Sequence, residues 1–166
     1  KLFMKKSNFI TGHNIRRNFD IKRDELVVGI SCYLHDSAVS FLQNGKIIYA
    51  SQEERHSRLK NDNSFPFMSL LNGLKFLGLF KSDIKNLVFH ESLNTLSQKE
   101  KKKIKNRLIN DLKFIGINPS KFYFLDHHYS HAAAGYFSSN FKKALIFSFD
   151  GMGEKVSTSI FRAENN

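Results

Sequence analysis

The chain has 166 residues with 26 basic and 15 acidic side chains, so its formal net charge is +11. Its length is enough for a domain with a sizeable core, and its apolar content of 41% argues against a disordered or collagen-like chain. The single cysteine, Cys32, excludes an internal disulfide, and the sequence contains neither a secretory signal nor an apolar run of ~18 residues, so we expect a cytoplasmic protein without a membrane span.

The first part of the chain predicts an antiparallel meander. Residues 1–24 mix charged and aromatic side chains without periodicity, and we expect a leading extension or linker there. Three compact apolar runs then predict strands, at 26–31, 38–42 and 46–50. Asn44 and Gly45 separate the last two runs, and this pair is typical of a tight hairpin turn because both residues tolerate positive φ.

Helices and further strands follow. The apolar spacing after Pro66 predicts a helix that ends at Gly78. Ser97 and Glu100 have the spacing of a capping box and predict the start of a second helix, which ends at Gly116. The remaining predicted elements are strands at 86–90 and 122–125, a helix at 128–137, and a hairpin of strands at 144–149 and 157–161.

This order of elements predicts an α/β fold with a mixed five-stranded sheet and flanking helices, of the ribonuclease-H-like kind. The closing hairpin resembles the first hairpin of a second such layer. We therefore expect a first subdomain over residues 25–141 and the truncated start of a second subdomain over residues 142–166.

The densest polar stretch runs from Asp126 to His131, directly after a predicted strand. His127 and His131 are four residues apart, so on a helix their imidazoles share one face and can converge on a metal ion. Histidines at a helix start can instead simply cap and solvate it. Asp150, at the end of a later strand, could add a ligand or orient a nucleotide phosphate through a metal, although Asp-Gly is also typical of an ordinary turn.

Two loops could bind an anion. Gly151 and Gly153 could adopt positive φ and bring backbone N–H groups close to a ligand. The polar turn at residues 33–37 could cradle a phosphate, or it could simply connect two strands.

The charged stretch at residues 52–60 allows a further anion site. Arg58 and Lys60 could hold an anion, with the acidic pair Glu53 and Glu54 fixing their orientation. Mixed charge of this density is otherwise typical of a solvated loop.

The surplus of basic residues is also open to two interpretations. Residues 99–107 carry most of it after the leading segment, and a solvated lysine face of a helix explains this run better than nucleic-acid binding. The sequence contains no nucleophile elbow, P-loop, GxGxxG or HExxH motif, which argues against covalent hydrolases and P-loop enzymes.

Taken together, five stretches resemble, in order, the amino-terminal domain of the NodU/CmcH-type O-carbamoyltransferases. They are residues 29–38, 52–60, 65–66, 126–133 and 150–154. The resemblance implies an actin-like ATPase (ASKHA) fold similar to that of the Kae1-like proteins that modify tRNA. It also implies a reaction in which carbamoyl-adenylate, made from carbamoyl phosphate and ATP, donates its carbamoyl group to a hydroxyl of a small molecule, with a bound divalent metal that is expected to be iron.

The resemblance also implies roles for individual residues. His127, His131 and Asp150 would be metal ligands, and His35 and Lys60 would lie near the adenylate and the carbamoyl group, with His35 as the candidate base. The residues expected to bind the nucleotide are Asp36, Ser37, Arg58, Gly151 and Gly153.

The chain departs from the family pattern at Asn61, where the family often has a histidine. The second actin-like half and the YrdC-like domain that makes the adenylate lie outside this sequence, so we expect the isolated chain to have little or no transferase activity. Two alternatives are a Kae1-like threonylcarbamoyl transferase acting on tRNA and a non-catalytic remnant that binds a metal or a nucleotide.

Overall fold

The computed structural model describes residues 3–8, 11–14, 24–94, 96–153 and 155–164. The chain divides into two compact units. Unit 1 comprises Lys1–Asp20, Glu91–Thr95 and Leu125–Asn166, and unit 2 comprises Ile21–His90 and Leu96–Phe124. In the described part of the chain, the helices are too short or too polar to cross a membrane.

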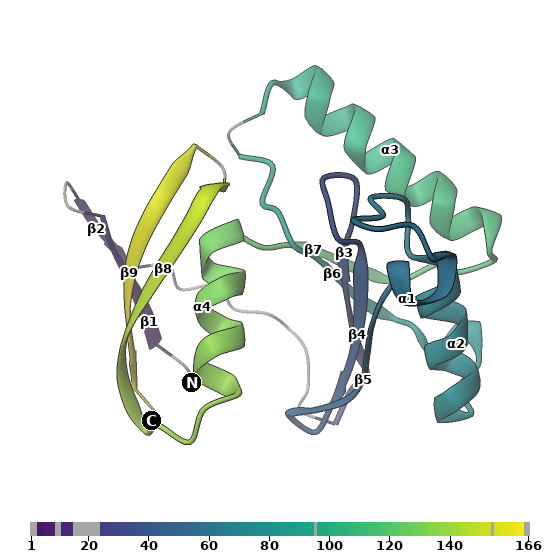
Figure 1. Cartoon of the computed structure of the whole chain (residues 1–166), viewed down its shortest axis with the longest axis horizontal. Coiled ribbons are helices and arrows are strands. Elements are labelled where there is room, and N and C mark those ends of the chain that lie inside the picture. The colour runs from purple at the N-terminus through teal and green to yellow at the C-terminus, as the bar shows by residue number, and fades with distance from the viewer. Residues whose placement is uncertain (1–2, 9–10, 15–23, 95, 154, 165–166) are drawn as a thin grey trace. The chain divides into compact units, whose positions relative to one another are not determined.

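Unit 2 is built on a mixed five-stranded sheet with the strand order β5-β4-β3-β6-β7 (Figure 1). Its strands are β3 (Val27–Ser31), β4 (Ala38–Gln43), β5 (Lys46–Gln52), β6 (Asn86–Phe89) and β7 (Lys121–Phe124). The pairs β3–β4 and β4–β5 are antiparallel, whereas β6 runs parallel to β3 and β7 parallel to β6. Asn44 and Gly45 both have positive φ, 54° and 72°, which confirms the predicted hairpin turn.

The helices of unit 2 flank this sheet, as the α/β prediction required. They are α1 (Glu54–Ser57), α2 (Phe67–Leu77), the short 3-10 helix η1 (Lys81–Asp83) and α3 (Gln98–Phe114). The predicted ends of the longer helices are confirmed, because Gly78 caps α2 with φ 65° and Ser97 forms a capping box with Glu100 at the start of α3. The turn of helix α1 was not predicted, since four residues are too few to show helical periodicity.

The sheet carries the core of unit 2 on alternating side chains. Val28 and Ile30 of β3 are 0% and 2% exposed. Phe41 of β4, which pairs with Val28 across the two strands, is also fully buried. Helix α2 packs against β4 and β5 at Gly73, where an added Cβ would lie 2.6 Å from Phe41 Cε2 and 2.9 Å from the Tyr49 ring. Only glycine, which has no side chain, is small enough for this contact.

We expect Gly73→Ala to destabilise the chain by about 1–2 kcal/mol. Overpacking of a tight core costs about 1–3 kcal/mol, while the better helix propensity of alanine returns at most about 1 kcal/mol. Gly135→Ala in helix α4 (His127–Phe137) is the matched control, because nothing lies within 4 Å of an added Cβ there and a gain of about 0.5–1 kcal/mol is expected. Urea unfolding followed by circular dichroism measures both variants, and equal stabilisation by the two would contradict the packing argument.

Unit 1 contains a second, antiparallel sheet with the order β2-β1-β9-β8, covered on one face by α4 (Figure 1). Its strands are β1 (Phe3–Asn8), β2 (Thr11–Asn14), β8 (Lys143–Gly153) and β9 (Val156–Glu164). The buried centre of this unit joins Ala132 and Tyr136 of α4 to Phe161 and Ala163 of β9. The predicted closing hairpin is thus present, with longer strands than the apolar pattern indicated.

Two features of unit 1 differ from the predicted division of the chain. The segment expected as a leading extension, residues 1–24, contributes β1 and β2, and β1 pairs with β9 from Phe3 opposite Glu164 onward. Helix α4 was placed in a first subdomain ending at residue 141, but it packs on β8 and β9 and groups with them. Both differences arise because contacts between segments distant in sequence, and not local periodicity, decide them.

Candidate metal centre

The carboxyl end of β7 leads directly into α4, and this junction places the histidines. Asp126 is the N-cap of α4, and its Oδ1 accepts a hydrogen bond from the Tyr129 backbone N–H at 2.9 Å. The helix therefore begins at His127, and one helical turn later His131 occupies the same face.

Asp150 reaches this face from β8. Ala144 and Ile146 pack towards α4, whereas Phe147 and Phe149 on the alternate positions are 52% and 74% exposed. The even-numbered side of β8 that faces the helix continues to Asp150. The pairing of β8 with β9 shifts register between Phe149 and Gly153, and such bulges commonly re-aim a side chain next to functional sites.

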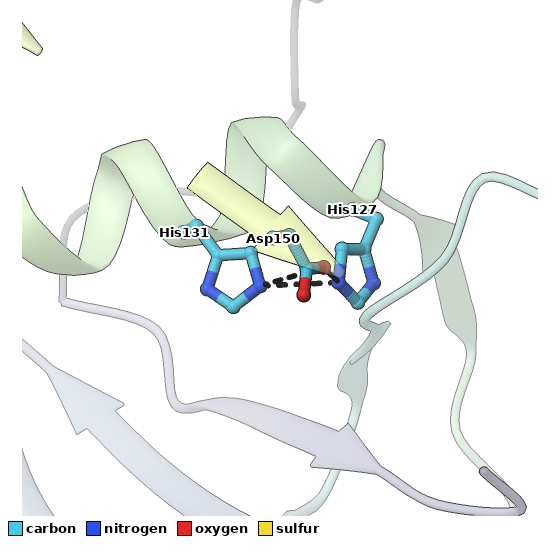
Figure 2. Close-up of side chains that lie close together, drawn as sticks. All are labelled: His127, His131 and Asp150. Carbon is cyan, nitrogen blue, oxygen red and sulfur yellow. Dashed lines mark hydrogen bonds and ion pairs between the residues drawn. The ribbon is translucent and has the colours of Figure 1, made fainter. Parts of the chain in front are cut away.

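Three potential ligand atoms meet between α4 and β8 (Figure 2). His127 Nε2 lies 2.7 Å from Asp150 Oδ2 and 3.0 Å from His131 Nε2, and the distance from His131 Nε2 to Asp150 Oδ2 is 3.6 Å. All three belong to unit 1. The structure thus brings together the residues that the helical spacing and the resemblance selected.

The spacing of these atoms fits a shared metal ion. Nitrogen and oxygen ligands bind such ions at about 2.0–2.2 Å, so two neighbouring ligand atoms on one ion are roughly 3 Å apart. Two imidazoles with one carboxylate form the facial ligand set of non-haem Fe(II) sites, and the same donors also suit zinc and manganese. His131 is the most open of the three side chains at 55% exposure, so the site is reachable from solvent.

The electrostatics of the site favour the deprotonated, ligand-competent forms. Burial, followed by the nearby His127, lowers the pKa of His131. Burial alone would raise the pKa of Asp150, but the Gly151 N–H, which donates to Oδ1 at 2.7 Å, and the two imidazoles together lower it. Because metal ligands must be deprotonated to bind, the lowered pKa values keep His131 and Asp150 able to bind an ion at lower pH than free side chains would.

The glycines beside Asp150 both lie in strand β8. Gly151 lies in β8 without positive φ, and its N–H is used by the neighbouring carboxylate of Asp150. Gly153 is the last residue of β8 and pairs with Val156. Gly151 therefore lacks the positive φ that the anion-binding interpretation of this loop required.

The remaining predicted site residues lie in unit 2, on two loops that hydrogen bonds hold together. The Tyr33 N–H donates to Asn63 O at 2.9 Å, and the Ser37 N–H donates to Asp62 O at 2.7 Å. His35 is exposed, and its Nδ1 lies 3.0 Å from the Asp36 carboxylate. Ser37 is fully buried, so its backbone connects the loops while its hydroxyl is withheld from any ligand at the surface.

Arg58 and Lys60 are exposed on the second loop, and the acidic pair Glu53 and Glu54 contacts other groups. Glu54 accepts a hydrogen bond from the Asn61 N–H at 3.0 Å. Glu53 is 3% exposed, and its two carboxylate oxygens accept hydrogen bonds from residues at the start of α2. The contacts of these carboxylates are with backbone N–H groups and, for Glu54, with Arg55 at 3.5 Å, and not with the two basic side chains.

Sequence reasoning missed the role of Glu53 as an external cap. It accepts from the Met68 N–H at 2.9 Å and from the Ser69 N–H at 2.8 Å. The sequence contained a signal for such a cap, because α2 starts after Pro66, which has no side chain that can cap the helix. A helix start of this kind needs an acceptor from elsewhere in the chain.

Tyr33 is a second residue whose role emerged only from the structure. Its hydroxyl donates to Asp111 of α3 at 2.7 Å, and the Arg107 guanidinium lies 4.2 Å from its ring centroid. Tyr33 and Asp36 both have positive φ, 76° and 47°, a strained backbone that is typical of functional loops. Anchoring by α3 stabilises the loop that carries His35.

Comparison with known proteins shows to which family the chain belongs. Residues 26–107 match the family described as carbamoyltransferase N-terminus. The chain is also 27% identical to nodulation protein NolNO of Sinorhizobium fredii, over 75% of this chain and 21% of that protein. The chain belongs to the carbamoyltransferase family.

Two uncharacterised relatives extend the similarity. A protein of Synechocystis sp., sll1178, is 31% identical over 84% of this chain, and MJ1051 of Methanocaldococcus jannaschii is 31% identical over 80%. The chain spans between 21% and 28% of the length of these three relatives. The family match includes the loops with His35 and Lys60 and ends before His127.

Proposed function

We propose that this chain contributes a metal centre and substrate-binding loops to an O-carbamoyltransferase that carbamoylates a hydroxyl of a small metabolite. The observation that carries the proposal is the convergence of two imidazoles and one carboxylate in a member of the carbamoyltransferase family. The proposed donor is carbamoyl-adenylate, formed from carbamoyl phosphate and ATP by another part of the protein. The proposed fold class is that of actin-like ATPases (ASKHA, Kae1-like), which the mixed sheet of unit 2 supports at the level of architecture.

A divalent ion, proposed to be Fe(II), would supply positive charge that stabilises the oxygen of the carbamoyl carbonyl. His127 and His131 would hold this ion through Nε2, and Asp150 through Oδ2. The carboxylate would also reduce the net charge of the loaded site, and the ion would take the place of the proton that His127 Nε2 and Asp150 Oδ2 share.

For the loops of unit 2 we propose two roles. The exposed imidazole of His35, which lies 3.0 Å from the Asp36 carboxylate, would accept the proton of the attacking hydroxyl. The ammonium of Lys60 would stabilise negative charge on the carbamoyl or phosphate oxygens. Arg58 and Asp36 would contact the nucleotide directly.

A carbamoyl-transfer assay tests the proposal. Radiolabelled carbamoyl phosphate, ATP, Fe(II) and a panel of hydroxylated acceptors, such as an aminoglycoside, are supplied to the 166-residue chain and to a longer protein that contains it. The chain alone is expected to show little or no turnover because it spans at most 28% of its relatives, whereas the longer protein is expected to carbamoylate an acceptor. Robust turnover by the chain alone would refute the proposal that another part of the protein forms carbamoyl-adenylate. Failure of the longer protein with every acceptor would count against carbamoyl transfer.

A further inference from the structure

The third histidine of α4, His128, is buried beside the metal centre without belonging to it. Its side chain is 1% exposed, and Nε2 lies 2.7 Å from the backbone carbonyl oxygen of Val156. A carbonyl oxygen only accepts hydrogen bonds, so Nε2 of His128 carries the proton and Nδ1 is left as a bare acceptor. Among the described residues, Nδ1 has no hydrogen-bond partner.

A buried histidine with only one hydrogen bond destabilises the fold compared with an apolar side chain, so the bond from Nε2 to Val156 must have a role of its own. A buried polar atom without a hydrogen-bond partner destabilises the fold, and an apolar ring of similar size would fill the same space without that cost. The bond to Val156 is therefore the feature that distinguishes His128 from a phenylalanine at this position. It ties the first turn of α4 to the beginning of β9.

Val156 lies at the hairpin end that holds Asp150. The ladder pairs Phe149 with Thr158 and resumes at Gly153 opposite Val156, so residues 150–152 stand opposite Ser157 alone. Asp150 therefore lies in a stretch that regular cross-strand bonds do not position. The His128 bond fixes the far side of this stretch to the same helix that carries His127 and His131.

We propose that His128 is a positioning residue, which holds the hairpin end so that the Asp150 carboxylate stays against the imidazoles of His127 and His131. The proposal rests on the metal centre described above. Replacing residues that hold metal ligands in place without binding the ion themselves lowers metal affinity by about 10–100-fold. His128 acts through a backbone carbonyl, so its effect on the ion is indirect.

Titration of the wild-type chain and of His128→Phe with Co(II), monitored by visible absorption, tests this proposal. We expect the affinity for Co(II) to fall about 10–100-fold in His128→Phe and to recover largely in His128→Gln, whose amide can donate to the same carbonyl. Tyr136→Phe is the matched control. It removes a partly buried hydrogen bond from the other end of α4, where Tyr136 donates to Lys142 O at 3.0 Å, and should leave Co(II) affinity unchanged. Equal affinity in His128→Phe and wild type would overturn the proposal.

A second measurement is independent of metal binding, and its wild-type part does not depend on the folding of any variant. Long-range ¹H–¹⁵N spectra of the metal-free wild-type chain should show His128 as the Nε2–H tautomer with a slowly exchanging proton, and the Nδ1–H tautomer would overturn the proposal. The same spectra should show the His127–Asp150 hydrogen bond in wild type and Tyr136→Phe, and its loss in His128→Phe. If wild type binds no Co(II), the proposed metal centre fails, while these spectra still decide the role of His128.

Discussion

Replacing His127 by alanine is expected to lower the affinity of the chain for Fe(II) or Co(II) by roughly 100-fold or more, which exceeds the effect of losing an orienting residue. His127 makes the two shortest contacts of the centre, 2.7 Å to Asp150 and 3.0 Å to His131, and its loss leaves only His131 and Asp150 as donors. His131→Ala should act in the same direction. Elemental analysis after gel filtration and Co(II) titration measure the effect, and circular dichroism should show an intact fold.

His35→Ala is the matched control for this prediction. His35 also pairs with a carboxylate, at 3.0 Å from Asp36, but it is exposed in unit 2 and has no second imidazole beside it among the described residues. Metal content should therefore remain at the wild-type level in His35→Ala. Metal binding by His127→Ala at wild-type affinity would show that the ion, if bound, is held elsewhere.

Replacing Glu53 by alanine is expected to destabilise the chain by about 3 kcal/mol. The change leaves the N–H groups of Met68 and Ser69 without their acceptor, and Glu53 and Ser69 are both almost completely buried. Each lost bond to a charged partner contributes about 1.5–3 kcal/mol, and the carboxylate also interacts favourably with the positive end of the α2 dipole. Urea unfolding followed by circular dichroism gives the free energy of unfolding.

The neighbouring residue supplies the control for Glu53. Glu54 accepts a single backbone hydrogen bond, from Asn61, and its side chain is 20% exposed, so water can replace that bond. We expect Glu54→Ala to cost less than about 1 kcal/mol. Equal losses in the two variants would mean that Glu53 does not act as the cap of α2.

Local signals in the sequence were enough to predict the sheet of unit 2. Asn44-Gly45 formed the expected turn, and Ser97 with Glu100 formed the expected capping box, because both motifs act over a few residues of backbone. The pairing of His127 with His131 could also be predicted, since it depends only on helical geometry. Asp150 was placed with them through the resemblance to the carbamoyltransferases, because spacing along the chain says nothing about which strand end reaches a helix.

Sequence by itself therefore determined the local elements, the helix ends and the two histidines on one face. Only the tertiary structure decided that residues near the start of the chain pair with β9, that α4 packs on the closing hairpin, and that Glu53 caps a helix far from it in sequence. Strand partners and external caps satisfy backbone groups with acceptors and donors from remote segments, and a sequence pattern records the need for such a partner without naming it.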